Sequence, residues 1–203
     1  SESGANANAT YSVGTGSSTT GDTLSLGATN ATERALGSLR SGMLASMYGA
    51  QFTNSTGSSV ASLSIDFTGE QWRIGVTSRA APDRLDFQYS TNATSLTTGT
   101  WIDVDALDFS GPITTAGAAG PLNGKVDPNR THVSGTVSAT IAAGATFWIR
   151  FVDADATGAD DDLAVDDFHL VAHGVTPPPA VDLQKTVSAP TPAGPTSVLT
   201  YTI

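Results

Sequence analysis

The stretch THVSGTVSATI, residues 131–141, decides the fold class. Every second residue from Val133 to Ile141 is apolar or Gly, and the residues between them are Ser or Thr. A period of two residues with one polar face is the pattern of a β-strand that has a core on one side and water on the other. This stretch therefore predicts a half-buried strand in a sheet.

Similar patterns recur along the chain. Alternation predicts strands over residues 85–90 and 163–172, and an apolar run interrupted only by Arg150 predicts a central strand over residues 147–152. Residues 60–76 predict a hairpin that turns at residues 68–70. About nine or ten short strands, with no amphipathic helix longer than two turns, predict an all-β fold, a two-sheet jelly-roll sandwich.

The composition excludes several classes of protein. The 203 residues carry a net charge of −10, which argues against a nucleic-acid-binding face, because phosphates require clustered Lys and Arg. The chain has no Cys, which excludes disulfides, Cys-based zinc sites and a thiol nucleophile. No apolar run is long enough for a membrane-spanning helix. Together with 51 Ser and Thr residues, these features predict an extracellular or surface-displayed bacterial protein.

Changes in composition divide the chain into four segments. Residues 1–20 are polar and small, and predict a flexible arm or a loosely held edge; residues 21–173 predict the sandwich. Residues 174–180 contain three consecutive prolines, which favour an extended polyproline linker. Residues 181–203 predict two strands, the second of which has Leu199, Tyr201 and Ile203 at alternate positions.

Seven of the sixteen aspartates lie between Asp153 and Asp167. The run begins like a calcium-binding loop, with carboxylates, a hydroxyl and a Gly, but Ala164 stands where an EF-hand has its bidentate Glu. A looser structural Ca²⁺ site would offset the repulsion among these carboxylates. Its predicted ligands are, from the acidic turn and from the N-terminal side, Asp153, Asp155, Asp160, Asp161, Asp166, Asp22 and Glu33. The alternative is a solvated acidic turn.

Asp166 is the first choice among these ligands. It lies an even number of residues from Ala164, Phe168 and Leu170, so a regular strand would place all four on one face, which is expected to face the core. A carboxylate among core residues is costly unless it is paired or bound to a metal ion. A bulge that moves Asp166 to the rim of the sheet is the other reading.

Motifs for catalysis are missing. The chain has no G-x-S-x-G elbow, no H-E-x-x-H sequence and no P-loop, and its three histidines are His132, His169 and His173. No pair of carboxylates can be chosen for glycosidase chemistry from one sequence. We therefore expect no enzymatic activity.

Trp101, next to Gly99 and Thr100, is a candidate platform for stacking on a sugar ring.

The body resembles a jelly-roll domain of bacterial secreted and surface proteins that often stands beside extracellular nucleases. The matching stretches are GDTLSLG (21–27), ERALGSL (33–39), GEQWR (69–73), DRLDFQYS (83–90), FWIRF (147–151) and DDDLAVDDF (160–168). The last of these is also similar to the closing strand of MAM domains and of calcium-binding carbohydrate-binding jelly rolls. The resemblance implies a jelly roll whose closing strand runs past a structural calcium ion. It also implies a supporting role, not a catalytic one.

The tail from Val181 resembles the first strands of DUF11, a bacterial surface repeat with an Ig-like sandwich. Two strands cannot form such a sandwich alone, since it needs about seven.

Two function classes follow from these observations. In the first, the chain is a structural subunit that forms a head-to-tail homopolymer, a filament or layer, by donating its tail strand to the next copy. In the second, it is a carbohydrate-binding or accessory module of a longer secreted enzyme such as a nuclease, with surface glycans as partners. We favour the first because the tail is an unfinished set of strands on a Pro-rich tether.

Overall fold

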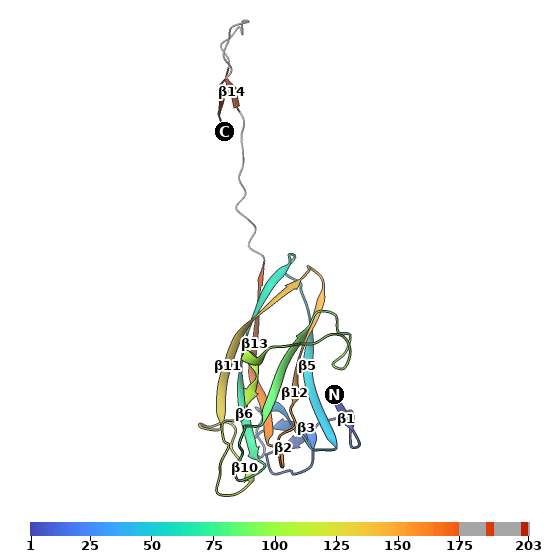
Figure 1. Ribbon diagram of the computed structural model, residues 1–203, viewed down its shortest axis with the longest axis vertical. Helices are drawn as coiled ribbons and strands as arrows, with labels where there is room; N and C mark the ends of the chain where they lie inside the picture. Colours follow the sequence, from blue (N-terminus) through green and yellow to red (C-terminus); the bar gives the residue numbers. More distant parts are fainter. Residues whose placement is uncertain (175–185, 189–199, 203) are drawn as a thin grey trace.

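The computed structural model describes residues 1–174, 186–188 and 200–202. Residues 1–174 form two facing β-sheets (Figure 1), so the predicted all-β sandwich of the jelly-roll kind is confirmed. The described residues contain one 3₁₀ turn, η1 (Asp105–Leu107), and no α-helix. Consequently, no helix in this part of the chain is long and apolar enough to cross a membrane.

The first sheet has the strand order β1-β5-β12-β7-β8, with β9 also paired to β7. Its strands are β1 (Glu2–Gly4), β5 (Leu44–Thr53), β7 (Arg84–Ser90), β8 (Ile102–Asp103), β9 (Phe109–Ser110) and β12 (Thr146–Asp153). β12 lies between β5 and β7, as its nearly uninterrupted apolar sequence predicted.

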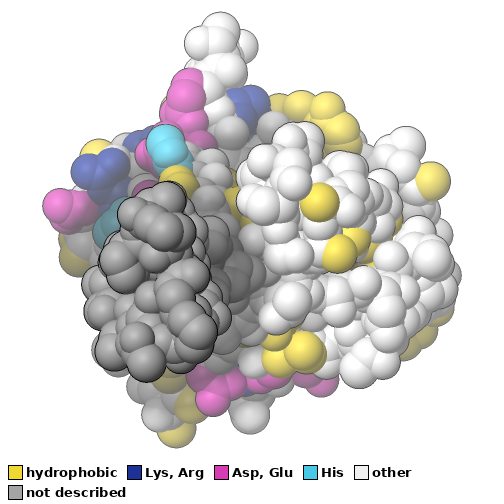
Figure 2. Space-filling model, turned by 90° about the horizontal axis from the view of Figure 1, so that it is seen from above, with side chains coloured by type: hydrophobic (Ala, Val, Ile, Leu, Met, Phe, Trp, Pro, Cys, Tyr) yellow, Lys and Arg dark blue, Asp and Glu magenta, His cyan; other side chains and the backbone are white. Residues whose placement is uncertain are grey.

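The second sheet has the order β10-β6-β13-β4-β3-β2, with β11 also paired to β6. Its strands are β2 (Ser12–Gly14), β3 (Asp22–Leu26), β4 (Ala35–Leu39), β6 (Val60–Ile74), β10 (Gly120–Pro121), β11 (Arg130–Ile141) and β13 (Asp162–Gly174). All neighbours are antiparallel except β2 and β3. In the view of Figure 2, backbone and side chains that are neither hydrophobic nor charged cover most of the described surface.

The main core fills the space between the sheets. It contains the fully buried Phe67, Phe87 and Leu163, and Phe151 contacts both phenylalanines edge-on. A second, smaller cluster lies on the opposite face of the second sheet, because successive residues of β13 point to opposite sides. Its members are Leu24, Leu26, Ala35, Leu39, Trp72 and Ala164.

The hairpin predicted over residues 60–76 is wrong, because Val60–Ile74 form the single strand β6. This strand of 15 residues pairs with β11 on one side and β13 on the other. Gly69, expected in the turn, lies within the strand, and a Cβ at this position would overlap the ring of Phe109. The glycine is therefore needed for the close approach of Phe109. From the sequence alone, a glycine with this role looks the same as a glycine in a turn.

Of the two alternatives for residues 1–20, a flexible arm or a loosely held edge, the structure shows the edge. β1 pairs with β5, and β2 pairs with β3. The amino group of Ser1 donates a hydrogen bond of 2.7 Å to the carbonyl oxygen of Met47. Backbone pairing holds these strands although their side chains are mostly exposed. Their sequences therefore lack the apolar alternation from which a strand is predicted.

β13 contains a bulge between Asp166 and His169, where Asp167 has a φ of 50°. Leu163 and Val165 face the main core before the bulge, and Phe168 packs against the same core after it. Because one extra residue reverses the alternation, Asp166 lies on the outer face. The predicted face shared with Phe168 and Leu170 is wrong, and the alternative prediction, a bulge that moves Asp166 away from the core, is confirmed.

In the tail, β14 (Thr186–Ser188) and β15 (Thr200–Thr202) form an antiparallel pair with Val187 opposite Tyr201. Leu199 and Ile203, two of the predicted donor residues, lie outside the described residues, as does the Pro-rich stretch after Gly174.

Candidate functional site

The acidic turn lies between β12 and β13, and Asp161 is the most strongly bound of its carboxylates. Its Oδ1 accepts hydrogen bonds from the amide of Gly75 (2.6 Å) and from Nη2 of Arg79 (2.7 Å). Its Oδ2 accepts one from Nε2 of Gln71 (2.8 Å). The side chains of Arg79 and Asp161 are almost completely buried, so the guanidinium supplies the positive charge that this carboxylate needs.

Asp83 joins the same network from the segment before β7. Its Oδ2 accepts the amide of Asp161 at 2.7 Å, and its Oδ1 accepts the amide of Arg84 at 2.8 Å. Nη2 of Arg79 lies 3.8 Å from Oδ2. Burial raises the pKa of the Asp83 carboxyl to about 6.

Arg40 holds the other side of the turn. It donates to the carbonyl oxygen of Asp153 at 2.9 Å, and its Nε lies 3.3 Å from Oδ1 of Asp155. The buried carboxylate of Asp153 accepts the hydroxyl of Ser38 at 2.7 Å. Asp160 closes the turn by accepting the amide of Ala156 at 2.9 Å. The predicted ligands of the acidic turn are thus close together, but each has protein partners.

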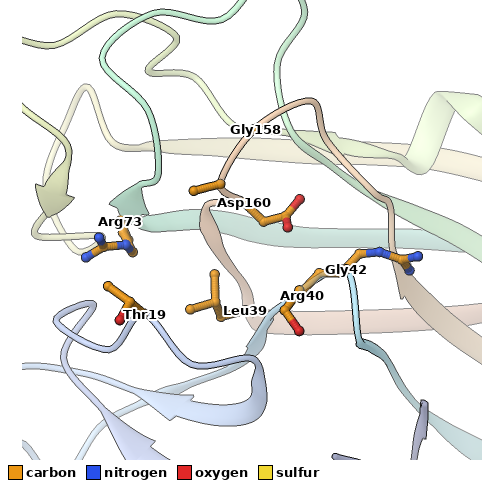
Figure 3. A pocket seen from close by; sticks show the side chains of 9 residues that line it. Thr19, Leu39, Arg40, Gly42, Arg73, Gly158 and Asp160 are labelled. Atoms are coloured by element: carbon orange, nitrogen blue, oxygen red, sulfur yellow. The ribbon is translucent and has the colours of Figure 1, made fainter. Parts of the chain in front are cut away.

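Asp162, the first residue of β13, is fully buried, and neither of its oxygens has a hydrogen-bond partner in the described part of the chain. Burial raises the pKa of its carboxyl to about 7. It lies directly opposite Leu39 on β4 and Arg73 on β6. Beside these two residues is a cavity of about 180 Å³, also lined by Thr19, Arg40 and Asp160 (Figure 3).

Asp166 and Glu33 come together at a different place, around Lys125. Nζ of Lys125 lies 2.5 Å from Oδ2 of Asp166, contacts Glu33, and is 3.5 Å from Oε1 of the buried Glu70. Burial lowers the pKa of the Lys125 ammonium, but its hydrogen bonds to Asp166 and Glu33 outweigh this, and the pKa is raised. Three carboxylates therefore share one protein cation.

Asp22 is separate from both groups. Its Oδ2 accepts the hydroxyl of Ser12, which ties β3 to β2. Among the residues that the structure describes, no group of three or more His, Asp or Glu is arranged to hold a metal ion. Calcium binding stays a prediction from the sequence.

Trp101, the candidate sugar platform, is half-buried. Its Nε1 donates to the carbonyl oxygen of Thr98 at 2.8 Å, and the guanidinium carbon of Arg150 lies 4.0 Å from the ring centroid. One face of the indole is thus occupied by Arg150, a cation–π contact.

The histidines lie exposed on β11 and β13. His173 contacts the hydroxyl of Ser64 at 2.7 Å on the open face of the sheet. No carboxylate is hydrogen-bonded to His173 within residues 1–174, so this pair lacks the third group of a Ser-His-Asp triad.

Sequence reasoning missed Arg40, Arg79, Asp83 and Lys125, which balance or extend the acidic network. One signal was present: Lys125 is one of only two lysines in a chain with 19 acidic residues, and it lies within the long loop before β11. Arg79 and Asp83 lie in a segment without periodicity, and nothing in its pattern points to the acidic turn.

No protein-family model matches the chain, and no curated protein matches it. The resemblances to the secreted jelly roll and to DUF11 therefore stay predictions. Among solved structures, the chain is similar to the CBM22-1 xylan-binding domain from Paenibacillus barcinonensis Xyn10C. The two are 12% identical with a TM-score of 0.37, and the match covers 77% of this chain and 83% of that one. A likeness this weak carries no argument about function, and the assignment of the sandwich rests on strand pairing.

Proposed function

We propose that this protein is a non-enzymatic, extracellular structural subunit that joins copies of itself head to tail by donating a β-strand from its tail. The observation that carries the proposal is the pairing of β14 with β15. Within the described residues, these two strands pair only with each other and with neither sheet of the body. A two-stranded hairpin is at best marginally stable in water, so it needs a further surface.

The sequence of the tail supports strand donation. Residues 197–203 contain no charged residue, and Leu199, Tyr201 and Ile203 alternate with Val198, Thr200 and Thr202. Burying three such side chains contributes roughly 5–8 kcal/mol before the cost of ordering, at about 1.5–3 kcal/mol each. A subunit that gives one strand and accepts another makes a head-to-tail contact, which continues into a filament unless a ring closes.

Two full-length double variants test this proposal. Leu199→Asp/Tyr201→Asp places charges on the apolar positions, and the control Thr200→Asp/Thr202→Asp places the same charges on the alternate positions. We expect the wild type and the control to assemble, as measured by light scattering and electron microscopy, and the first variant to stay at the monomer mass of 20.6 kDa. Equal assembly of both variants would contradict strand donation.

A carbohydrate-binding role is the second candidate, and the position of Trp101 favours it. Arg150 holds the indole in a fixed orientation in a half-buried site on the surface. Titration with xylan fragments and other soluble glycans, followed by Trp fluorescence, tests this role, with Trp101→Ala as the control. No spectral change in the wild type would exclude these glycans.

A further inference from the structure

The edge of the first sheet is open along most of β5. β12 pairs with Met47–Thr53 on one side, but on the other side β1 reaches only Leu44–Ser46. The amide of Met47 donates to the carbonyl oxygen of Ser1 at 2.8 Å, which shows that its N–H points away from β12. Because this direction alternates along a strand, the amides of Gly49, Gln51 and Thr53 point to the open edge. In the described part of the chain, no strand pairs with them.

The second sheet is open on the same side. β4 pairs with β13 only over Asp162–Val165, and after the bulge β13 pairs with β6 alone among the described residues. Between the open parts of β5 and β13 lies a groove with a cavity of about 190 Å³. Its side chains come from both sheets and include Leu36, Tyr48, Phe52, Phe151, Val165 and Phe168.

The groove leaves apolar residues uncovered that a complete sandwich would bury. Ala50 lies on the same face of β5 as Tyr48 and Phe52, yet it is exposed. Leu36 is 44% exposed. No residue that lines the groove is charged, although the chain carries a net charge of −10. The groove thus fits an uncharged strand whose alternate residues are apolar, with a backbone that can pair with an open edge.

We infer that the groove between β5 and β13 accepts the C-terminal strand, residues 199–203, of a second copy. This inference rests on the proposed function and names its acceptor. The strand pairs with the edge of β5 at Gly49–Thr53, and Leu199, Tyr201 and Ile203 enter the groove beside Ala50. Docking desolvates no charged side chain, because none lies in residues 199–203 or in the lining of the groove.

The donor belongs to another copy because of the way in which the chain leaves the sandwich. β13 ends at Gly174, at the upper end of the body in Figure 1. The sequence TPPP at residues 176–179 favours an extended polyproline conformation. A segment with this preference would direct the tail away from its own groove, and for this reason the proposed donor is a second copy.

Two full-length variants on adjacent residues of β5 test the acceptor. Ala50→Lys places an ammonium in the groove, and Gln51→Lys places the same group on the opposite face of the strand. Both side chains are exposed, so both variants should keep the melting temperature of the wild type. We expect Ala50→Lys to lose assembly and remain at the monomer mass, and Gln51→Lys to assemble like the wild type.

The outcome also separates this inference from the proposed function. If Ala50→Lys assembles normally while Leu199→Asp/Tyr201→Asp does not, the tail is the donor but the groove is not its acceptor, and the inference is overturned. If all variants assemble normally, or if the wild type is monomeric at every concentration, both the inference and the proposed function are overturned.

Discussion

The guanidinium of Arg79 and the carboxylate of Asp161 lie 2.7 Å apart, and both side chains are almost fully buried. Arg79 precedes β7 and Asp161 precedes β13, so the pair connects two loops at the acidic end of the sandwich. The carbonyl oxygens of Thr157 and Ala159 also accept hydrogen bonds from Arg79. The turn that the sequence assigned to calcium is thus organised by an arginine.

Replacing Arg79 by Met should lower the free energy of unfolding by about 3–5 kcal/mol, because Asp161 would remain as a buried charge without a counter-charge. The control is Arg130→Met, since both side chains of the ion pair between Arg130 and Asp127 are exposed and its loss should change the stability little. Urea denaturation measures both. Similar losses for the two variants would show that the buried pair has no special role.

The stability of the body should fall as the pH rises through about 7. Burial raises the folded-state pKa of Asp162 to about 7, whereas its ordinary value is 3.8, and Arg73 compensates only in part. The folded state therefore holds this proton more tightly than the unfolded state. The stabilisation that results is complete below about pH 4 and is lost as the pH rises through the folded pKa, up to about 4 kcal/mol.

Asp162→Asn isolates this contribution. At pH 4 the variant and the wild type should have similar melting temperatures, and at pH 8 the variant should melt higher, because it has no charge to bury. A difference between the two proteins that does not change with pH would show that Asp162 does not titrate in this range.

Calcium is the point at which sequence and structure lead to different expectations. The sequence predicts that Ca²⁺ raises the melting temperature, whereas the pairing of Asp155, Asp161 and Asp166 with Arg40, Arg79 and Lys125 predicts little change. We expect the same melting temperature in millimolar Ca²⁺ and in excess chelator. A rise with Ca²⁺ that Asp166→Asn abolishes would support the site predicted from the sequence.

Lys125→Met should destabilise the body by about 1–3 kcal/mol, because Glu33, Glu70 and Asp166 would lose their shared cation and Glu70 is buried. Arg130→Met is the matched control, since its ion pair with Asp127 is exposed and its loss should leave the melting temperature unchanged. Thermal unfolding at pH 7 compares them. If Arg130→Met lowers the melting temperature as much as Lys125→Met does, the loss of stability comes from the loop and not from the charge cluster.

The fold class was predictable because alternation records which face of a strand meets the core. The strand over residues 131–141 was found in this way, and its two sides are as expected. The strand over residues 147–152 was found instead from its apolar run, which predicted its central place in the sheet. Alternation failed at Asp166, where a bulge, the stated alternative, reverses it. The turn signal failed at Gly69, where the glycine serves a packing contact with Phe109. Both failures depend on contacts between segments far apart in the sequence.

The acidic site was predictable only in part. A run of aspartates shows that charge must be balanced, but it does not identify the counter-ion. Arg79 and Lys125 reach their partners from loops 82 and 41 residues away in the chain. Likewise, the groove beside β5 results from where β1 and β4 stop, and strand length is set by pairing that no single stretch reveals.

The most direct test of strand donation into the groove beside β5 is cross-linking by single cysteines, which the Cys-free chain permits without background. Ala50→Cys is mixed in turn with variants that carry one Cys at positions 199 to 203, and disulfide-linked heterodimers are measured on non-reducing gels. Strand donation into this groove predicts strong cross-links at 199, 201 or 203 and weak ones at 200 and 202, and the reverse pattern when Gln51→Cys replaces Ala50→Cys, because Gln51 shares its face with residues 200 and 202. Cross-links of equal strength at every position, or none at all, would contradict it.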